Sequence, residues 1–532
     1  MRLRSCHPAT MLPLALAAAA HLLPAQQPGP ERASFYLLLR GDTIFEERDS
    51  RTPTELSGEF RDRLRNVRVS YDATLNSSAL VTHLDLRTFR SSQGTGDPAT
   101  FTIDGDSVVA KIGNAAPAKI PSISGALAIV NPAVGFIEQI VMRARAIGGD
   151  PASVMIFVIG APQPLAGTVT RVGADSVRVA YAGVTMDLAV SPTGRVLGGV
   201  IPAQGIRIAR GAALGAISAA PATNYSAPPN APYVAEDVVV TTSTELHLAG
   251  TLTIPKVRPS GKVPAVITIT GSGPEDRDEQ SGAIPGYRPF RELADTLGRR
   301  GIAVLRLDDR GVGASDAGPA SVTSADFAND IRTGIAYLRS RPEIDGSRIG
   351  IVGHSEGGII APMIAVGDPK LRGLVLMAGS ASKGREIVMD QNRYVIDSVA
   401  HLRGPTRDSA LAKAGRSVDS LGAQGGWLGF FLAYDPTTAA RQVKTPVLIL
   451  QGETDRQVPP AQARLLADAF RAGGNRDVTV RMFPATNHLF LADSSGAFAD
   501  ASGALRYTKL PSLHVRPEVL GAIADWLNDR LK

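Results

Sequence analysis

The sequence contains a single cysteine, Cys6, among 532 residues. A lone thiol near the N-terminus leaves no internal disulfide, no thiolate metal site and no cysteine nucleophile in the rest of the chain. Aromatic residues make up only 5%, and 10 of the 56 basic residues are lysines. No dense run of Lys and Arg with interleaved aromatic residues is present, so we expect no nucleic-acid partner.

What the chain has in quantity is apolar residues, at 44%, against 20% charged residues. This balance is typical of folded globular domains, and the length suits two or three of them. The formal net charge of +6 is spread over the whole chain. Composition therefore indicates a globular protein with a sizeable core.

The N-terminus has the pattern of an export signal. Arg2 and Arg4 precede an apolar run from Met11 to Ala20, which ends in small residues that suit signal cleavage, and a second cleavage site follows Ala25. The run is too short to span a bilayer comfortably. We expect residues 1–25 to be a signal peptide, the protein to be periplasmic or secreted, and no stable membrane insertion after cleavage.

Residues 31–210 are rich in strand-like segments separated by turn signals, with one helical stretch from Pro132 to Ile147. They contain no catalytic constellation. We expect a β-rich N-terminal domain of unknown role, a twisted sheet or partial barrel, which is a candidate binding module for a partner that the sequence does not identify. Residues 211–233 are rich in Ala, Pro, Ser and Asn and are interpreted as a linker.

From residue 234 to 532, short apolar strands alternate with longer helical stretches. Apolar runs of this kind between helices predict a buried, mostly parallel sheet with helices on both faces, a doubly wound α/β fold. Residues 383–441 interrupt the alternation with helical segments, and we expect them to form a cap inserted between two strands. The expected strands begin at Ala265, Ile302, Arg348, Gly373, Val447 and Val478.

A candidate nucleophile follows the strand that begins at Arg348. Gly353-His354-Ser355-Glu356-Gly357 matches the pattern G-x-S-x-G, and an apolar helix follows it. A strand, a sharp turn and a helix in this order present the serine hydroxyl at the carboxyl edge of the sheet. Flanking glycines permit the strained turn. We expect Ser355 to be the nucleophile.

Five motifs make residues 234–532 resemble the α/β-hydrolase superfamily, and in particular bacterial secreted esterases and the dienelactone-hydrolase and serine-aminopeptidase-like branches. They are Gly271-Ser-Gly-Pro-Glu-Asp-Arg-Asp, Asp308-Asp-Arg-Gly-Val-Gly-Ala-Ser, Gly353-His-Ser-Glu-Gly-Gly, Gln451-Gly-Glu-Thr-Asp and Asn487-His488. The resemblance implies Asp455 as the catalytic acid and His488 as the base, in the chain order serine, acid, histidine. Glu453 is the alternative acid, and the other candidate bases are His354, His401 and His514.

An oxyanion hole needs N–H donors beside the nucleophile. The fold implies the N–H of Glu356 as one donor, and the loop after the strand at Ala265 as the source of the other, with Ser272 first and Gly273 next. The superfamily often has His-Gly where this chain has Thr270-Gly271. The charge run 276–278 is interpreted as stabilising this loop, and the loop that begins at Asp308 is expected to border the site.

Aromatic residues gather in the expected cap, where Trp427, Phe430 and Phe431 either line a substrate pocket or pack the cap onto the core. With the resemblance, these residues predict a serine carboxylesterase that hydrolyses small-molecule acyl esters through an acyl-enzyme, with no metal or organic cofactor. A serine peptidase or aminopeptidase on the same triad is the alternative, although no acidic pair for an amino terminus is identifiable. A non-catalytic binding protein that kept the fold is the alternative from another class.

Overall fold

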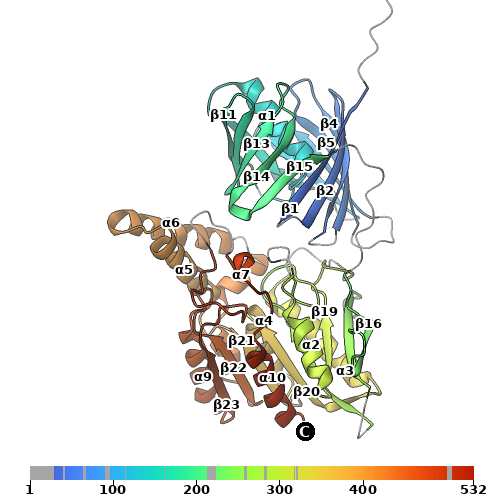
Figure 1. The fold of residues 1–532 in the computed structure, drawn as a ribbon, viewed down its shortest axis with the longest axis vertical. Coiled ribbons are helices and arrows are strands. Elements are labelled where there is room, and N and C mark those ends of the chain that lie inside the picture. Colours follow the sequence, from blue (N-terminus) through green and yellow to red (C-terminus); the bar gives the residue numbers. More distant parts are fainter. Residues whose placement is uncertain are drawn as a thin grey trace, which may run out of the picture.

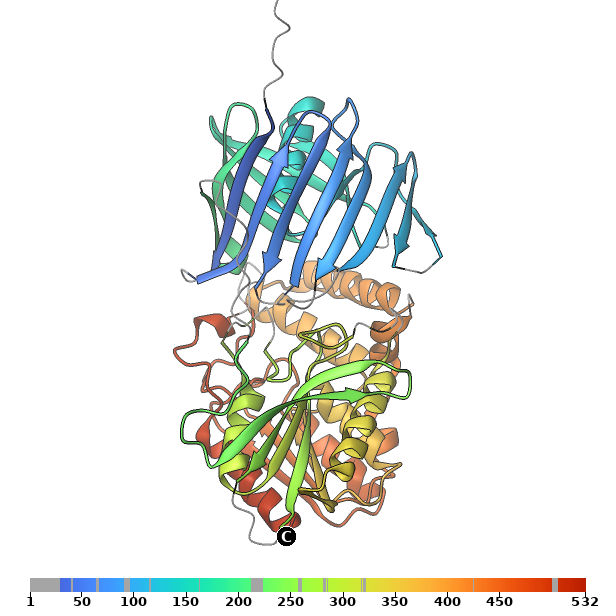
Figure 2. The same ribbon diagram turned by 90° about the vertical axis from the view of Figure 1, so that its right-hand side faces the viewer.

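A computed structural model of the protein describes two successive domains, which Figures 1 and 2 show stacked with the N-terminal one on the side of the cap. The predicted signal peptide and Cys6 lie outside the described residues. Within the described part of the chain, no helix has the length and apolar character to cross a membrane. The structure describes residues 29–39, 42–63, 67–89, 96–113, 116–161, 163–211, 223–256, 261–280, 284, 286–316, 318, 322–423, 425–499 and 506–532.

The N-terminal domain is one 15-stranded sheet in the order β8-β7-β6-β5-β4-β3-β2-β1-β15-β14-β13-β12-β11-β10-β9. Neighbouring strands are antiparallel except β9 and β10, which are parallel. This confirms the predicted β-rich region. The strands are β1 (Glu31–Leu39), β2 (Asp42–Arg51), β3 (Glu55–Asp62), β4 (Val67–Leu75), β5 (Val81–Phe89), β6 (Asp97–Asp104), β7 (Ser107–Ile112), β8 (Ala118–Pro121), β9 (Leu127–Ile129), β10 (Ala152–Val158), β11 (Leu165–Gly173), β12 (Ser176–Tyr181), β13 (Val184–Val190), β14 (Val196–Ile201) and β15 (Ile206–Gly211).

The sheet curves around a single helix, α1 (Val134–Ile147), which Figure 1 shows inside it. Alternation in the strands explains the core, because in β4 Val69, Tyr71, Ala73 and Leu75 are all buried and face the same side. No side chain of the preceding segment caps α1. The buried carboxylate of Glu47 in β2 accepts its first N–H groups instead, from Val134 and, at 3.2 Å, from Gly135.

The C-terminal domain is built on an eight-stranded sheet in the order β16-β17-β19-β18-β20-β21-β22-β23. The hairpin β16–β17 joins β19 in antiparallel pairing, and the strands from β19 to β23 are parallel to one another. The strands are β16 (Tyr233–Thr241), β17 (His247–Pro255), β18 (Val263–Ile269), β19 (Ala303–Leu307), β20 (Ile344–His354), β21 (Gly373–Met377), β22 (Val447–Gly452) and β23 (Val478–Phe483).

Helices cover both faces of this sheet, as predicted for a doubly wound α/β fold. Successive side chains of a strand point to opposite faces of the sheet and join different hydrophobic cores. Ala265 and Ile267 pack with α3, α4 and α9, whereas Val266 packs with α2 and α10. This is why the strands are apolar at every position rather than at alternate ones. The helices are α2 (Pro289–Arg299), α3 (Ser324–Ser340), α4 (Glu356–Ala365), α9 (Ala461–Ala472) and α10 (Pro517–Arg530).

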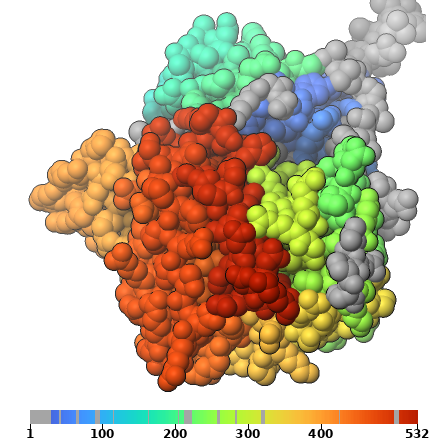
Figure 3. Space-filling model, turned by 60° about the horizontal axis from the view of Figure 1, so that its bottom comes forward, coloured from blue at the N-terminus to red at the C-terminus, as the bar shows by residue number. Residues whose placement is uncertain are grey.

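The helical segment between β21 and β22 lies where the cap insertion is predicted. It consists of α5 (Gly384–Tyr394), α6 (Gly404–Gly422), α7 (Gly426–Ala433) and α8 (Pro436–Ala440), with one wider helical turn over Val395–Val399. Figure 3 shows part of this cap, in light orange, projecting from the side of the molecule. Helix α7 contacts both α5 and α6, whereas α8 packs on α4 and α9 of the core.

Candidate active site

Ser355 stands at the sharp turn between β20 and α4. Its backbone has φ 52° and ψ −112°, a conformation that costs energy for a residue with a side chain and is held here by its surroundings. Its N–H donates to the carbonyl of Met377 in β21 at 2.8 Å. The turn therefore points the hydroxyl away from the sheet at the carboxyl end of β20.

The glycines beside Ser355 are required by close packing. A Cβ atom at Gly353 would lie 2.2 Å from the carbonyl oxygen of Gly357, and a Cβ at Gly357 would lie 2.3 Å from the carbonyl oxygen of Ile269 in β18. Neither approach is possible for a larger residue without moving backbone. The flanking glycines thus let α4 begin directly against two strands.

The structure brings Ser355, His488 and Asp455 together, although 133 residues separate the first pair. His488 Nε2 lies 3.1 Å from Ser355 Oγ, and His488 Nδ1 lies 2.8 Å from Asp455 Oδ2. With Nδ1–H donating to the carboxylate, Nε2 is left to accept the proton of the serine hydroxyl.

Asp455 is fully buried and well held. Its Oδ1 accepts the N–H groups of Gln457 and Val458 at 2.8 and 2.9 Å, and its Oδ2 accepts the side-chain amide of Gln451 at 2.8 Å. Charge-assisted bonds of this kind fix the carboxylate toward the imidazole. Glu453, the alternative acid from the sequence, is exposed two residues away.

The other candidate bases lie elsewhere. His354 Nδ1 is hydrogen-bonded to Glu279 Oε1 at 2.6 Å, and its Nε2 to the carbonyl oxygen of His488 at 3.0 Å. Neither nitrogen is therefore left for the serine. Burial alone lowers the pKa of His354, but the charge of Glu279 and the hydrogen bond to it prevail, and the pKa is raised. His514 pairs with Glu292 at the surface, and His401 is exposed in the cap.

The two first-choice oxyanion donors flank the nucleophile. Glu356 is the first residue of α4, so its N–H has no carbonyl partner within the helix. Ser272 and Glu356 line the same cavity as Ser355, whereas Gly273 lines a neighbouring one. The N–H of Gly271 is already used by two carboxylates, those of Glu275 and Glu279.

The cavity beside Ser355 has a volume of about 360 Å³. Trp427 and Phe431 of the cap line it and stack on each other with ring centroids 5.6 Å apart. Phe430, predicted with them, stacks on Tyr434 instead and is not among the described residues that line the cavity. Of the three aromatic residues predicted for the pocket, the structure therefore places two there.

The side chain of Glu356 links three separate elements beside the cavity by hydrogen bonds. It accepts hydrogen bonds from Ser272 Oγ at 2.8 Å, from Ser324 Oγ at 2.6 Å and from the Trp427 indole at 2.8 Å. The loop after β18, helix α3 and the cap thus all converge on the residue that follows the nucleophile.

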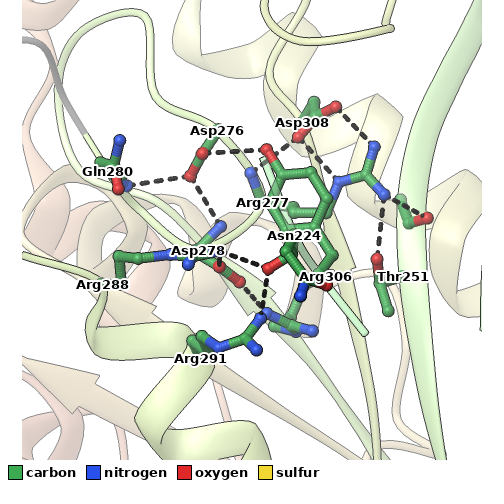
Figure 4. A network of polar contacts seen from close by, with 12 residues as sticks. Asn224, Thr251, Asp276, Arg277, Asp278, Gln280, Arg288, Arg291, Arg306 and Asp308 are labelled. Carbon is green, nitrogen blue, oxygen red and sulfur yellow. Dashed lines mark hydrogen bonds and ion pairs between the residues drawn. The ribbon is translucent and has the colours of Figure 1, made fainter. Parts of the chain in front are cut away.

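A buried ionic network supports the loop after β18 (Figure 4). Arg277 donates to both oxygens of Asp308, through Nε at 3.0 Å and Nη2 at 2.7 Å, and to Thr251 Oγ1 at 2.9 Å. Asp278 pairs with Arg288 and Arg306. These contacts agree with the loop-stabilising role predicted for residues 276–278, and they fix the backbone that carries Ser272.

Sequence reasoning missed two acidic residues of the site. Glu275 and Glu279 flank the charge run that was recognised, and both line the cavity with Ser355. The available signal was their spacing of four residues in the loop after a buried strand. Their meeting depends on how that loop folds back on Gly271, which the residue types do not reveal.

Known proteins resemble the C-terminal domain. Residues 283–501 match the alpha/beta hydrolase family model. The chain is 28% identical over 286 residues to Esterase EstD of Thermotoga maritima, covering 53% of this chain and 65% of that protein. It is 26% identical over 187 residues to the alpha/beta hydrolase domain-containing protein WAV2 of Arabidopsis thaliana, covering 35% of this chain and 54% of that one.

The matches span less than two thirds of the length of these two curated relatives. Among solved structures, an esterase of Pyrococcus furiosus is 16% identical, with 59% of this chain and 97% of that chain covered and a TM-score of 0.40.

Proposed function

Because the chain belongs to the α/β-hydrolase superfamily, we propose that it is a serine carboxylesterase that works through a Ser355–His488–Asp455 triad. The observation that carries the proposal is the unbroken path of hydrogen bonds from the buried carboxylate through the imidazole to the hydroxyl. Similarity to an esterase over half of the chain supports ester hydrolysis as the reaction.

In the first half-reaction, His488 Nε2 takes the proton of Ser355 as Oγ attacks the ester carbonyl carbon. The new Oγ–C bond gives a tetrahedral oxyanion, which the N–H groups of Ser272 and Glu356 stabilise. The C–O bond to the alcohol then breaks, and His488 returns the proton to the leaving oxygen. An acyl-enzyme and a free alcohol result.

In the second half-reaction, water replaces the alcohol. His488 takes a proton from the water, its hydroxide oxygen adds to the acyl carbon, and the bond to Oγ breaks as Ser355 regains a proton. The products are a carboxylic acid and the original enzyme. Each step uses only groups of this chain, the ester and water, and Asp455 stabilises the imidazolium formed in both halves.

Turnover of 4-nitrophenyl butyrate by wild type and by the Ser355→Ala variant tests this function. Loss of the nucleophile should lower kcat by about 10⁴-fold or more. Ser347→Ala serves as the matched control, because Ser347 is exposed at the start of the same strand and bonds only within its own turn. A Ser355→Ala protein with wild-type activity would refute the proposal.

The alternatives from the sequence predict different rates. A peptidase on the same triad would hydrolyse the 4-nitroanilide of a given acyl group at a measurable rate, whereas an esterase would hydrolyse its 4-nitrophenyl ester and leave the anilide intact. A binding protein that kept the fold would turn over neither.

We also propose that the chain is exported, on the pattern of Arg2, Arg4 and the apolar run after them. N-terminal sequencing of protein recovered from the periplasm or medium tests this.

A further inference from the structure

The cavity beside Ser355 is lined by acidic side chains and by two histidines, His354 and His488, with no lysine or arginine among its described lining residues. Three glutamates face it. Glu356 is satisfied by its three hydrogen-bond donors, as described above. The other two, Glu275 and Glu279, share one hydrogen-bond donor, the N–H of Gly271.

Both of these carboxylates converge on one backbone N–H. That of Gly271 lies 3.0 Å from Glu275 Oε2 and 2.9 Å from Glu279 Oε1. A Cβ atom at Gly271 would lie 3.3 Å from Glu279 Oε1, 3.4 Å from Ser355 Cβ and 3.5 Å from Glu275 Oε2. Both carboxylates and the nucleophile therefore surround a single point of the loop.

A second, independent observation concerns the remaining oxygen of Glu279. Glu279 is only 2% exposed. Its Oε1 accepts hydrogen bonds from Gly271 and His354, whereas its Oε2 is buried without a hydrogen-bond partner. A buried carboxylate oxygen in this state is costly unless a donor reaches it. Burial, together with the charges of Glu279 and Asp309, also raises the pKa of Glu275 well above its usual range. His354 already faces Oε1 of Glu279, so a second cation beside Glu275 would balance the charge that remains on the pair.

We propose that Glu275 and Glu279 bind the protonated amine of a substrate whose acyl part carries an amino group next to the scissile carbonyl. This inference rests on the proposed hydrolytic function and narrows its substrate class. An ammonium group has three donors, of which one meets Glu275; the free oxygen of Glu279 is enclosed, so it accepts a second only when its carboxyl group turns toward the cavity. Because both carboxylates and Ser355 Cβ lie within 3.5 Å of one point beside Gly271, an α- or β-amino acyl group is short enough to place its carbonyl carbon at Ser355.

The competing explanation is structural. On that view the pair only holds Gly271 and His354 in place, and a charge on the substrate makes no difference. The two explanations separate when substrates of equal shape and different charge are compared, because only the amine site distinguishes an ammonium from a methyl group.

L-Alanine benzyl ester and benzyl isobutyrate form such a pair, since an ammonium in one replaces a methyl in the other. At about pH 7 the amine is protonated, because an α-amino group has a usual pKa of about 7.7. The measured quantity is the ratio of kcat/KM for the two esters, from the release of benzyl alcohol. The Glu275→Gln variant should lower this ratio about tenfold or more relative to wild type, because it removes a charge-assisted bond. Comparing variants cancels the higher intrinsic reactivity of the ammonium ester.

Glu453→Gln is the matched control, because Glu453 is exposed outside the cavity. It should keep the wild-type ratio. If Glu275→Gln also keeps the wild-type ratio while hydrolysing both esters, the proposed amine site is wrong.

Binding to the Ser355→Ala protein provides an arm that does not depend on catalysis. Calorimetry should show that N-benzyl-L-alaninamide binds about tenfold or more tightly than N-benzylisobutyramide, and that adding Glu275→Gln removes the difference. Equal affinities would overturn the inference. If wild type hydrolyses neither ester but this preference is present, the amine site stands and the proposed hydrolysis fails.

Discussion

At the scale of single residues, the site depends on side chains that are held more firmly than a surface triad would be. Asp455 accepts three hydrogen bonds besides that of His488 and has no exposed area. Such a carboxylate imposes one ring orientation and one tautomer on the histidine. The geometry seen between His488 and Ser355 is therefore a consequence of the buried acid.

Replacing the acid by its amide should separate geometry from charge. In the Asp455→Asn variant the side chain keeps its size, but its NH₂ group can face Nδ1 and favour the wrong tautomer, so we expect kcat to fall by about 10³- to 10⁴-fold. Steady-state kinetics on 4-nitrophenyl butyrate measures this. The Glu453→Gln variant should retain wild-type kcat; the opposite ranking of the two variants would make Glu453 the acid.

Sequence patterns locate these three residues because each follows a buried strand, and the carboxyl ends of parallel strands share one edge. Ser355 follows β20, Asp455 follows β22 and His488 follows β23. Glu275 and Glu279 lie outside the reach of this reasoning. Their meeting is set by the fold of a loop and by contacts with distant residues such as His354.

At the scale of elements, the turn that carries Ser355 is defined by backbone packing. Helix α4 starts so close to β18 that position 357 has no room for a methyl group. The same strand ends in the loop that carries Ser272, so any displacement of β18 moves a proposed oxyanion donor as well as the nucleophile.

A Gly357→Ala variant should test this coupling. Its Cβ would lie 2.3 Å from the carbonyl oxygen of Ile269 and 2.8 Å from that of Thr270, so backbone must shift. We expect a fall of about 1–3 kcal/mol in the free energy of unfolding and a large loss of kcat. Denaturant unfolding and kinetics give the two values.

Gly521→Ala in α10 is the control for that substitution. No atom lies within 4 Å of a Cβ at this position, and alanine favours helices, so stability should rise by about 0.5–1 kcal/mol. Equal stability changes in the two variants would contradict the packing explanation.

One indole of the cap, that of Trp427, donates a hydrogen bond to the residue that follows the nucleophile. In a Trp427→Phe variant the stacking on Phe431 can persist, but the hydrogen bond to Glu356 is lost. A bond to a carboxyl group contributes about 1.5–3 kcal/mol, so we expect the cap to dock less firmly and KM to rise more than kcat falls. Trp526→Phe in α10 is the matched control, because the buried Trp526 indole N–H has no partner to lose. A KM unchanged by Trp427→Phe would argue against this attachment.

The elements of the C-terminal domain are readable from sequence because their strands are apolar throughout. The run expected from Val478 to Phe483 is β23 as observed, and the one expected at Gly373 is β21. The N-terminal strands are harder to delimit, since most alternate between buried and exposed residues. Strand β6 contains Pro98 as its second residue although it is not an edge strand, and proline is usually confined to edge strands, strand starts and bulges.

At the scale of the whole molecule, the two domains have separate cores and differ in what they bury. The N-terminal core holds carboxyl groups beside its helix. Burial and the neighbouring charge of Asp49 raise the pKa of Glu47 from 4.5 to about 8, and burial raises that of Asp49 from 3.8 to about 6. The sequence places these residues in the β-rich region 31–210 but does not show that they point inward.

These groups predict that the protein is less stable at about pH 8 than at about pH 5. In the unfolded chain Glu47 ionises near its usual pKa, whereas in the folded chain it keeps its proton to a higher pH. Its stabilising contribution is therefore complete below the unfolded pKa and is lost as pH rises through the folded one, at most about 1.4 kcal/mol per pH unit for each group. Calorimetric Tm values of the full chain measure this.

The variant Glu47→Gln should lose part of that dependence, because the amide has no proton to release while its oxygen can still accept from α1. Glu46→Gln is the control, since Glu46 is less buried and pairs with Arg63 instead. A Tm that rises between these pH values, or equal slopes for the two variants, would contradict the assignment.

The central claim is that Ser355 is activated by His488, and covalent labelling tests it most directly. Treatment with diethyl 4-nitrophenyl phosphate, followed by peptide mass spectrometry, should find one diethylphosphoryl group, attached to Ser355. In the His488→Ala variant the rate of labelling should fall by about 10³-fold or more. A wild-type protein that is not labelled, or that is labelled only at another residue, would contradict the account.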